Sequence, residues 1–588
     1  MGVVDSSRLL QYPRSMRKLL VSVLAFLLLG STASLALGET SAPDEQWVQP
    51  VKYEDGWKAL TLDETTVRET SALFGTVNDP STKLTVEQSR EKYFCKDALA
   101  EECKKFFTLE FRATLPVCDN SITTNCLESF YGIKANGERV EGVFQKYTES
   151  TPFAFPAHEK YGIPAGAYPS LWKLPGIANS SGAEDYVLTP FVYGDTRYEK
   201  WQANPTFRHN QIVASVYAVK AEAGSRYRPI YAMDASTSPS KIIGSSNSGN
   251  NMCAAQDIGL CYMRYPLPTD VQLGMTLRLN TTFEPWIHGR VADPNISITS
   301  LGSNGSRIDV SGTAMRISNL GTWARAEALT PEIREWILND DHENGGSGPW
   351  ENHRSLTKTF AYNIGVSGEG NIKQLKMWLP VLGDKASANP TTWSFRFLES
   401  RELSGANKCI KSSNQLAGFV STNASVYSAG PPVYNSATGS LDYTVIAPHF
   451  DATGKEFLGT YDLLIRDSVA RCIYGFSDAP IKAEISIVSE DGTNKVSTNT
   501  ITKKGEWIAL SAKGFTYSTP TIRVKLSQTP VEAQQSTVNS TQETKAAAPV
   551  TTMKPKSLKK VVTCAKGKVV RKISGLNPKC PSGYKIIK

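Results

Sequence analysis

The sequence GSLDYTVIAPHFDATGKEFLGTYDLLIRD, residues 439–467, decides the fold class of this chain. Its two β-rich segments, GSLDYTVIAPHF and EFLGTYDLLIRD, flank a turn sequence at Asp451–Gly454. Similar segments follow at intervals of about ten residues, namely IKAEISIVS, KVSTNTITK, EWIALSA and TPTIRVKLSQ. Short strands at regular spacing, with turn residues between them, are typical of a β-sandwich. We therefore predict a β-sandwich domain over residues 403–528.

The same strand pattern recurs on the N-terminal side of this sandwich. Apolar and polar residues alternate in FTLEFRATL, and CLESFYGIKANGERVEGVFQKY predicts a hairpin that turns at Asn136 and Gly137. Tyr, Phe, Trp, Thr and Val are frequent in the chain, which favours strands. We therefore predict an all-β, multi-domain protein of β-sandwich-like domains with a few short helices, in which residues 84–244 and 245–402 form two further β-domains.

Two segments favour helix instead. The sequence TPEIREWILNDD predicts a helix over residues 330–341, because Thr330 can cap it, Pro331 suits its first turn and apolar residues recur at helical spacing. The sequence LTVEQSREKYFCKDALAEECKKF, residues 84–106, also has helical propensity.

The N-terminus has the pattern of an export signal. Four basic residues precede an apolar run from Leu19 to Leu29, and Ala36 and Gly38 fit the small-residue rule for cleavage. We predict that residues 1–38 are removed as a signal peptide and that residues 39–83 form an N-terminal linker or extension. The apolar run is short for a transmembrane helix, and no second segment of about 18 apolar residues follows. We expect a mature chain without a transmembrane segment, secreted or associated with the cell envelope.

The chain has ten cysteines, an even number that predicts disulfides in an exported protein. Three pairs are each separated by seven residues, and short separations make local closure favourable. The spacing of cysteine and histidine fits no zinc site, so we expect neither a metal nor a cofactor. The helical segment around Cys95 must bend, because a disulfide cannot join residues eight apart in one straight helix. The predicted disulfides are Cys95–Cys103, Cys118–Cys126, Cys253–Cys261, Cys409–Cys472 and Cys564–Cys580.

The positive charge is concentrated at the C-terminus. The whole chain carries +8, and the part from Thr544 onward has twelve Lys or Arg and no Asp or Glu, so everything before it sums to −4. We therefore do not expect the body to bind nucleic acid. Residues 529–558, rich in Thr, Ser, Gln, Ala and Pro, predict a flexible linker to a basic module over residues 559–588.

Two interpretations of this basic module remain open. Its cations can attract anionic wall polymers or phospholipid headgroups at the end of a flexible tether. Alternatively, the module is only a solvated and stable C-terminus. The residues that we predict to attach the protein to a surface are Lys559, Lys560, Lys566, Lys568, Arg571, Lys572, Lys579 and Lys585.

Parts of the last 180 residues resemble exported proteins. The sequences GFVSTNASVY, GPPVYN, LDYTVIAPH, GTYDLLIRDSVARCIYGFS and WIALSAKGFTYSTPTIRVKL are similar to a domain of uncharacterised secreted actinobacterial proteins. The sequence TCAKGK…PKCPSGYK resembles a cysteine-lysine module that ends many exported proteins of that group. The resemblance covers about 150 residues and implies export or envelope association, but no particular activity.

The densest polar and aromatic stretch is EPWIHGRVADP, residues 284–294. If it is a strand, Trp286, His288 and Arg290 share one face, and the residues between them share the other. Such a face can stack on a sugar ring and hydrogen-bond its hydroxyls, with Asp293 as a further acceptor. In the alternative interpretation, Arg290 pairs with Asp293 and Trp286 packs in a core.

No stretch of the chain has the motif of a known reaction. The sequence lacks an HExxH zinc motif, and no nucleophile elbow, P-loop or dinucleotide fingerprint occurs in a strand–turn–helix context. We name no catalytic residue. The favoured hypothesis is a noncatalytic binding or structural protein of the cell envelope, and the alternative is a secreted carbohydrate-active hydrolase with paired carboxylates.

Overall fold

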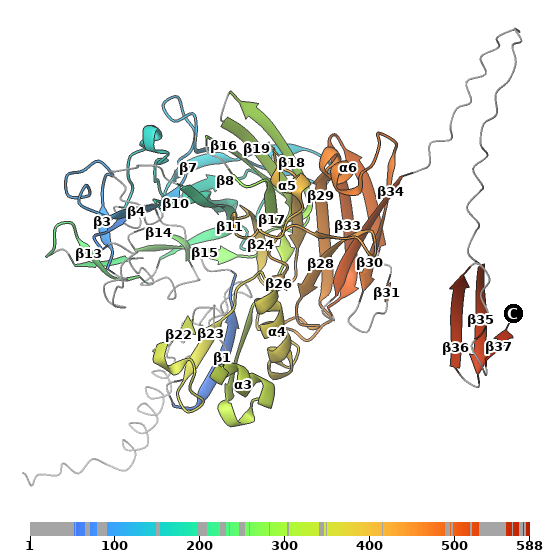
Figure 1. Cartoon of the computed structure of the whole chain (residues 1–588). Helices are drawn as coiled ribbons and strands as arrows, with labels where there is room; N and C mark the ends of the chain where they lie inside the picture. The colour runs from blue at the N-terminus through green and yellow to red at the C-terminus, as the bar shows by residue number, and fades with distance from the viewer. Residues whose placement is uncertain are drawn as a thin grey trace, which may run out of the picture. The chain divides into compact units, whose positions relative to one another are not determined.

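The structure is a computed structural model (Figure 1), which divides into two compact units, residues 1–530 and 531–588. The predicted signal peptide and the predicted flexible linker lie outside the described residues. The described residues are 52, 54–64, 71–78, 91–148, 153–196, 208–223, 231–234, 236–245, 253–257, 259–280, 283–302, 305–339, 346–347, 350–413, 415–488, 494–495, 498–517, 520–528, 560–566, 569–575, 580 and 584–587.

The predicted fold class is confirmed, because the first unit is built mainly of β-sheets that disulfides stabilise. Cys580 is disulfide-bonded, but the side chain of Cys564 lies outside the described part, so that pairing stays a prediction. No helix of the described residues is long and apolar enough to cross a bilayer. The disulfides confirmed in the structure are Cys95–Cys103, Cys118–Cys126, Cys253–Cys261 and Cys409–Cys472.

A 19-stranded sheet runs through the first unit. Its strand β11 pairs with β24, and β17 pairs with both β24 and β25, so the predicted boundaries near residues 244 and 402 do not separate sheets. The strands are β2 (Ala72–Thr76), β3 (Tyr93–Cys95), β4 (Thr108–Thr114), β7 (Val143–Tyr147), β8 (Ser170–Lys173), β9 (Asp185–Leu188), β10 (Phe191–Asp195), β11 (Arg208–Ala223), β12 (Tyr231–Asp234), β13 (Lys241–Ser245), β14 (Cys253–Asp257), β15 (Leu260–Tyr265), β17 (Trp286–Arg290), β20 (Met315–Arg316), β24 (Thr391–Phe397), β25 (Gly418–Thr422), β29 (Leu458–Arg466), β32 (Thr498–Lys504) and β33 (Trp507–Thr516).

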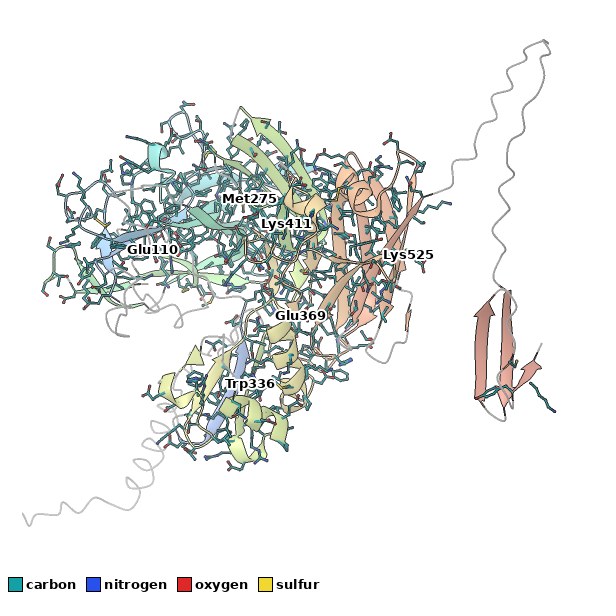
Figure 2. The ribbon with its side chains drawn as sticks, viewed as in Figure 1. Glu110, Met275, Trp336, Glu369, Lys411 and Lys525 are labelled. Atoms are coloured by element: carbon teal, nitrogen blue, oxygen red, sulfur yellow. A yellow bond between two sulfur atoms is a disulfide. The ribbon has the colours of Figure 1, made fainter. Side chains whose placement is uncertain are left out.

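A five-stranded sheet packs on the N-terminal part of this large sheet. The core between them includes Phe111, Phe130, Met275 (Figure 2) and Phe395, all nearly inaccessible to solvent. The hairpin from β5 to β6 turns at Asn136 and Gly137 as predicted, with Gly137 at a φ of 84°. The strands of this sheet are β18 (Ala292–Leu301), β19 (Gly305–Thr313), β16 (Gln272–Leu279), β5 (Cys126–Ile133) and β6 (Arg139–Glu141).

The C-terminal part of the large sheet faces a six-stranded sheet, and together they enclose a second core. Leu463 and Leu510 enter this core from the large sheet, and Tyr443 and Ile522 enter it from the other sheet. This is a two-layer arrangement of the kind predicted for residues 403–528. The strands of the six-stranded sheet are β26 (Val426–Tyr427), β27 (Val433–Asn435), β28 (Ser440–Ile446), β34 (Thr521–Gln528), β30 (Ile481–Val488) and β31 (Asn494–Lys495).

A four-stranded sheet and two helices form the third packed region. Trp336 of helix α3 packs edge-on against Tyr362, with ring centroids 4.9 Å apart (Figure 2). Strands β1 and β2 come from the range 39–83 that we expected as an extension, yet both pair with strands of the body. The elements of the third region are β1 (Trp57–Leu62), β21 (Leu320–Arg325), β22 (Gly346–Ser347), β23 (Phe360–Asn363), α3 (Pro331–Asn339) and α4 (Glu369–Leu382).

The helix predictions have mixed outcomes. Helix α3 is confirmed, and Thr330 caps it by accepting a hydrogen bond from the Ile333 amide at 3.3 Å. Of the segment 84–106, residues 84–90 lie outside the described residues, and in the remainder the helical expectation is wrong, because Tyr93–Cys95 form strand β3 and turns lead to Cys103. The remaining short helices are η1 (Glu159–Tyr161), η2 (Ala326–Ala328), η3 (Trp350–Asn352), α5 (Lys408–Lys411) and α6 (Asp467–Tyr474).

The second unit contains a three-stranded antiparallel sheet in the order β36–β35–β37. Its strands are β35 (Lys560–Lys566), β36 (Val569–Gly575) and β37 (Lys585–Ile587). The register places Lys572 opposite Thr563 and Lys585 opposite Ala565, so basic residues occur on both strands that flank β35.

Candidate functional site

The predicted sugar-binding residues lie on β17, which is buried along its whole length. Trp286 is 0% exposed and belongs to the second core, whereas Ile287 belongs to the first, so the predicted alternation of faces is confirmed. The Trp286 ring lies against Gly418 of the parallel neighbour β25, where an added Cβ would be 2.2 Å from the ring. Only glycine at position 418 allows this close packing.

His288 also points into the second core, toward tyrosine rings and an ion pair. Its Nε2 lies 3.4 Å from the Tyr443 hydroxyl, and its Nδ1 lies 3.5 Å from the Arg396 guanidinium. That guanidinium donates to both carboxylate oxygens of Glu402 at 2.7 and 2.8 Å. Burial and the cations Arg396 and Arg290 hold the pKa of His288 well below its usual value. The imidazole is therefore neutral at physiological pH.

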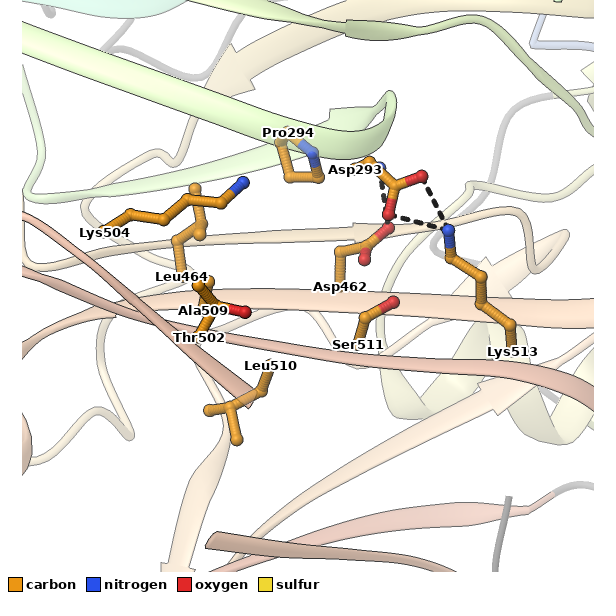
Figure 3. A pocket seen from close by; sticks show the side chains of 10 residues that line it. All are labelled: Asp293, Pro294, Asp462, Leu464, Thr502, Lys504, Ala509, Leu510, Ser511 and Lys513. Carbon is orange, nitrogen blue, oxygen red and sulfur yellow. Dashed lines mark hydrogen bonds and ion pairs between the residues drawn. The ribbon is translucent and has the colours of Figure 1, made fainter. Parts of the chain in front are cut away.

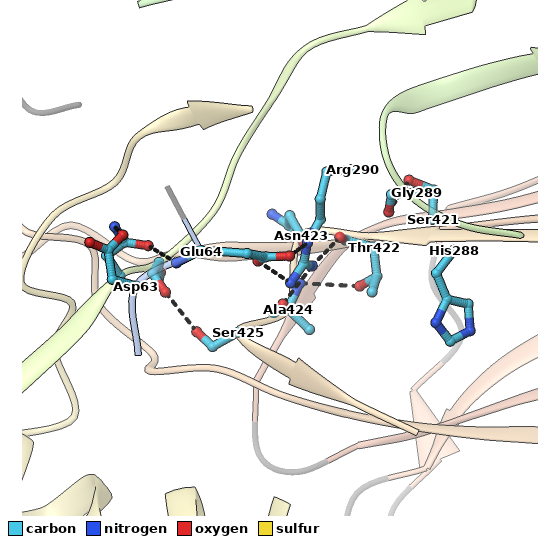
Figure 4. Close-up of polar contacts among 12 residues, drawn as sticks. Asp63, Glu64, His288, Gly289, Arg290, Ser421, Thr422, Asn423, Ala424 and Ser425 are labelled. Carbon is cyan, nitrogen blue, oxygen red and sulfur yellow. Dashed lines mark hydrogen bonds and ion pairs between the residues drawn. The ribbon is translucent and has the colours of Figure 1, made fainter. Parts of the chain in front are cut away.

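Arg290 joins three distant segments of the chain (Figure 4). Its guanidinium donates to both Glu64 carboxylate oxygens, at 2.8 and 2.5 Å. It also donates to the backbone carbonyls of Thr422 and Ala424 at 2.6 and 2.7 Å, and it stacks 4.8 Å from the Tyr427 ring centroid. Arg290 is only 2% exposed and the Glu64 side chain 19%, so the pair is largely shielded from water. A buried bidentate pair of this kind fixes the relative positions of the segments that it joins.

These contacts overturn the expectation of a sugar-stacking face. Trp286, His288 and Arg290 do come together on one face, but that face is interior and no sugar ring can reach it. The alternative interpretation is right that Trp286 packs in a core. It is wrong that Arg290 pairs with Asp293, because Arg290 pairs with Glu64 and Asp293 pairs with Lys513.

Asp293 lies where the chain leaves the large sheet and enters the five-stranded sheet. The register of β18 against β19 shifts between Ala292 and Asn295, which marks a β-bulge, and Asp293 itself has a φ of 50°. Bulges of this kind redirect a side chain, and they are frequent beside functional sites. Here the bulge turns Asp293 toward β33, where the Lys513 ammonium donates to both of its carboxylate oxygens at 2.7 and 2.6 Å.

A pocket of about 150 Å³ opens beside this ion pair (Figure 3). Strands β29, β32 and β33 supply most of its lining, and the bulge of β18 supplies the rest. Four charged side chains meet here with two hydroxyl groups and four apolar residues. The lining residues are Asp293, Pro294, Asp462, Leu464, Thr502, Lys504, Ala509, Leu510, Ser511 and Lys513.

Asp462 is the most buried charged group of the pocket, with 4% of its surface exposed. Its carboxylate accepts a hydrogen bond from the Asp293 backbone amide at 3.3 Å. Burial raises the pKa of Asp462 to about 6, and the Asp293 carboxylate adds to this rise, while Ser511 and Lys513 oppose it. Among the described residues, no cation forms an ion pair with Asp462, because the nearby Lys513 pairs with Asp293.

The patterns in the sequence pointed to Asp293 but not to the other charged residues of the pocket. A usable signal was present, since Asp462 stands alone between apolar residues in GTYDLLIRD, a strand whose centre is wholly buried. Burying a lone carboxylate in a strand lowers stability unless it is paired, so such a residue is a candidate for a functional role. Its neighbour across the sheet, Ser511, is set by the register of β29 with β33.

The predicted attachment residues lie in the second unit. The backbone of Lys560, Lys566, Arg571, Lys572 and Lys585 is described, and the side chain of Lys585 is exposed. Lys559, Lys568 and Lys579 lie outside the described residues.

Neither a metal site nor a known relative points to a function. Within the described ranges, no group of three or more His, Cys, Asp or Glu is placed to hold a metal ion. No protein-family model, curated protein or solved structure matches this chain.

Proposed function

We propose that this is an exported, noncatalytic binding or structural protein, held at an anionic surface by its basic C-terminal unit. The observation that carries the proposal is that the positive charge is segregated into a separate compact unit. Everything before Thr544 sums to −4, whereas the segment from Thr544 carries +12 and lies within the unit 531–588. The disulfides of the body and the signal-like N-terminus support export.

The shared chemistry of the surface ligand is a dense array of phosphate or carboxylate groups. Each Lys or Arg near an anionic lipid surface contributes about 1 kcal/mol at physiological ionic strength, and salt weakens the attraction. The backbone places Lys566, Lys572 and Lys585 on three different strands of one small sheet. Such a sheet is suited to multivalent, salt-sensitive adhesion.

The alternative, a carbohydrate-active hydrolase, has one observation in its favour, which is the neighbouring pair Asp293 and Asp462 with the raised pKa of Asp462. The geometry still supports binding better. Both oxygens of Asp293 are engaged by Lys513, none of the described lining residues is aromatic, and the volume of about 150 Å³ lies below the usual range of ligand pockets.

The test measures cosedimentation of the mature chain with two separate ligands, vesicles containing anionic phospholipid and purified anionic wall polymer. We compare the wild type with a triple variant, Lys566→Gln, Lys572→Gln and Lys585→Gln. We expect the variant to bind at least about tenfold more weakly at low salt, and we expect wild-type binding to decline as salt is added.

The matched control removes the same number of lysines from the body, through Lys373→Gln, Lys385→Gln and Lys482→Gln at exposed positions. This control should bind as the wild type does. Equal binding by all three proteins would refute the proposal. The ligand with which the wild type cosediments, vesicles or wall polymer, identifies the source of the anionic groups.

A further inference from the structure

The pocket beside Asp293 belongs to the first unit and has no part in the proposed attachment by the tail. We propose that this pocket binds a small zwitterionic amino compound, such as a free α-amino acid, with its ammonium group at Asp462 and its carboxylate group at Lys504. The inference stands independently of the proposed function, because the two rest on different residues in different units.

The ammonium half of the site is defined by Asp462 and Asp293. Asp462 is 4% exposed and lines the pocket without an ion pair to any described cation. A buried carboxylate in this state is costly, and a positively charged group that enters the pocket removes the cost. The Asp293 carboxylate adds negative potential, although its own ion pair with Lys513 already neutralises most of it. A ligand ammonium group is therefore the best complement to Asp462.

The carboxylate half of the site is defined by Lys504. The Lys504 ammonium donates to the neutral Asn295 amide oxygen at 2.7 Å, and among the described residues no carboxylate forms an ion pair with it. The exposed Lys504 side chain lines the pocket, so its charge is available to the carboxylate group of a ligand. The hydroxyl groups of Thr502 and Ser511, on the neighbouring strands β32 and β33, are further hydrogen-bonding groups of the lining.

Size and wall chemistry restrict the ligand further. A volume of about 150 Å³ lies below the roughly 300–1,000 Å³ of pockets that hold drug-sized ligands, which favours a small compound such as alanine. Leu464, Ala509, Leu510 and Pro294 provide apolar contacts for a short side chain. Since none of the lining residues in the described part of the chain is aromatic, these residues provide no stacking surface of the kind typical of a sugar site.

The experiment titrates the full mature chain calorimetrically with L-alanine, methylamine, acetate and glucose. We expect L-alanine to bind with a dissociation constant on the order of 1 mM. Methylamine and acetate each carry only one of the two charges, so each should bind at least about tenfold more weakly. Glucose should not bind.

Single substitutions assign each half of the site. Asp462→Asn should weaken L-alanine and methylamine by at least about tenfold and leave acetate unchanged. Lys504→Gln should weaken L-alanine and acetate and leave methylamine unchanged. The control Lys503→Gln alters the preceding residue on the same strand, which points to the opposite side, and should change nothing.

Three results would overturn the proposal. These are no saturable binding of L-alanine, binding of glucose in preference to L-alanine, or binding of L-alanine that survives both Asp462→Asn and Lys504→Gln. Circular dichroism of each variant checks that the sheets are intact, so that a loss of binding is not mistaken for unfolding.

Discussion

Arg290 and Asp462 are both buried charged side chains, yet their surroundings differ in one respect. Arg290 meets a carboxylate, two backbone carbonyls and an aromatic ring, which leaves its charge neutralised. Asp462 meets an amide and a hydroxyl, while the nearest lysine pairs with Asp293. Burial of a charged side chain does not by itself indicate a functional site. A buried charge indicates a candidate binding site when it has no ion-pair partner and borders a pocket.

The surroundings of Arg290 and the pocket that contains Asp462 are two neighbouring regions, and the chain passes directly from one to the other. Arg290 ends β17, and Asp293 begins the turn into the pocket shortly after it. Strand β17 thus joins three segments through Arg290, and the bulge that follows it supplies Asp293 and Pro294 to the lining of the charged pocket. We expect substitution of Arg290 and substitution of Asp462 to have opposite effects on stability.

The largest effect is expected from Arg290→Met, which keeps the length of the side chain and removes its charge. The substitution leaves Glu64 and two carbonyls without their donor, and breaking a buried ion pair in this way typically costs about 3–5 kcal/mol of unfolding free energy. Urea unfolding followed by tryptophan fluorescence measures the loss. The control Arg325→Met removes an exposed pair with Glu54, 40% and 75% accessible, together with a hydrogen bond to the Asp55 carbonyl and a contact with the Trp57 ring, and should cost about 1–2 kcal/mol. Equal losses would show that Arg290 has no special structural role.

The second effect has the opposite sign. In the folded state the pKa of Asp462 is raised to about 6, so folding takes up a proton at pH values where the unfolded carboxyl has already lost its proton. The unfolding free energy therefore falls as pH rises from about 4 through about 6, by at most roughly 3 kcal/mol for a shift of about two pKa units. Asp462→Asn should remove this fall and raise stability at pH 7 by about 1–2 kcal/mol. Parallel unfolding series at pH 4.5 and 7.5 measure it. A variant less stable than the wild type at both pH values would show that Asp462 is a structural residue.

That gain in stability also bears on function. The same Asp462→Asn substitution is expected to weaken ligand binding, so stability and binding should change in opposite directions. Such an exchange is characteristic of residues kept for a site at the expense of the fold. If the Asp462 carboxylate were purely structural, the Asp462→Asn variant would lose stability and ligand binding together.

The sequence predicts the local features of β17 well and its contacts poorly. Period-two alternation correctly places Trp286, His288 and Arg290 on one face. It does not reveal whether that face is interior, because this depends on two sheets that pack around it. The partner of Arg290 is Glu64, 226 residues away in a segment expected to be an extension, and no local pattern indicates such a pairing.

The pocket was unpredictable for a related reason. Its lining comes from β18, β29, β32 and β33, whose mutual register is decided by tertiary packing. The disulfides were easier to predict, because each of the four confirmed pairs joins two consecutive cysteines of the chain and depends little on strand register. For Asp462 the sequence does contain a signal, because it is the single acidic residue in the apolar centre of a strand.

The smallest effect is expected from Asp293→Asn, at the residue that separates the two regions. Asp293→Asn keeps a side chain that tolerates a positive φ and removes only a half-exposed ion pair with Lys513, so it should cost at most about 1 kcal/mol. Asp293→Ala should cost about 1–2 kcal/mol more, since alanine is strained at a φ of 50°. Loss of the Asp293 charge also lowers the pKa of Asp462, which should move the pH-dependent fall in stability to lower pH. Unfolding of both variants across pH 4–8 checks this. If alanine and asparagine behave alike, the bulge imposes no strain; if the pH window stays in place, the two carboxylates do not interact.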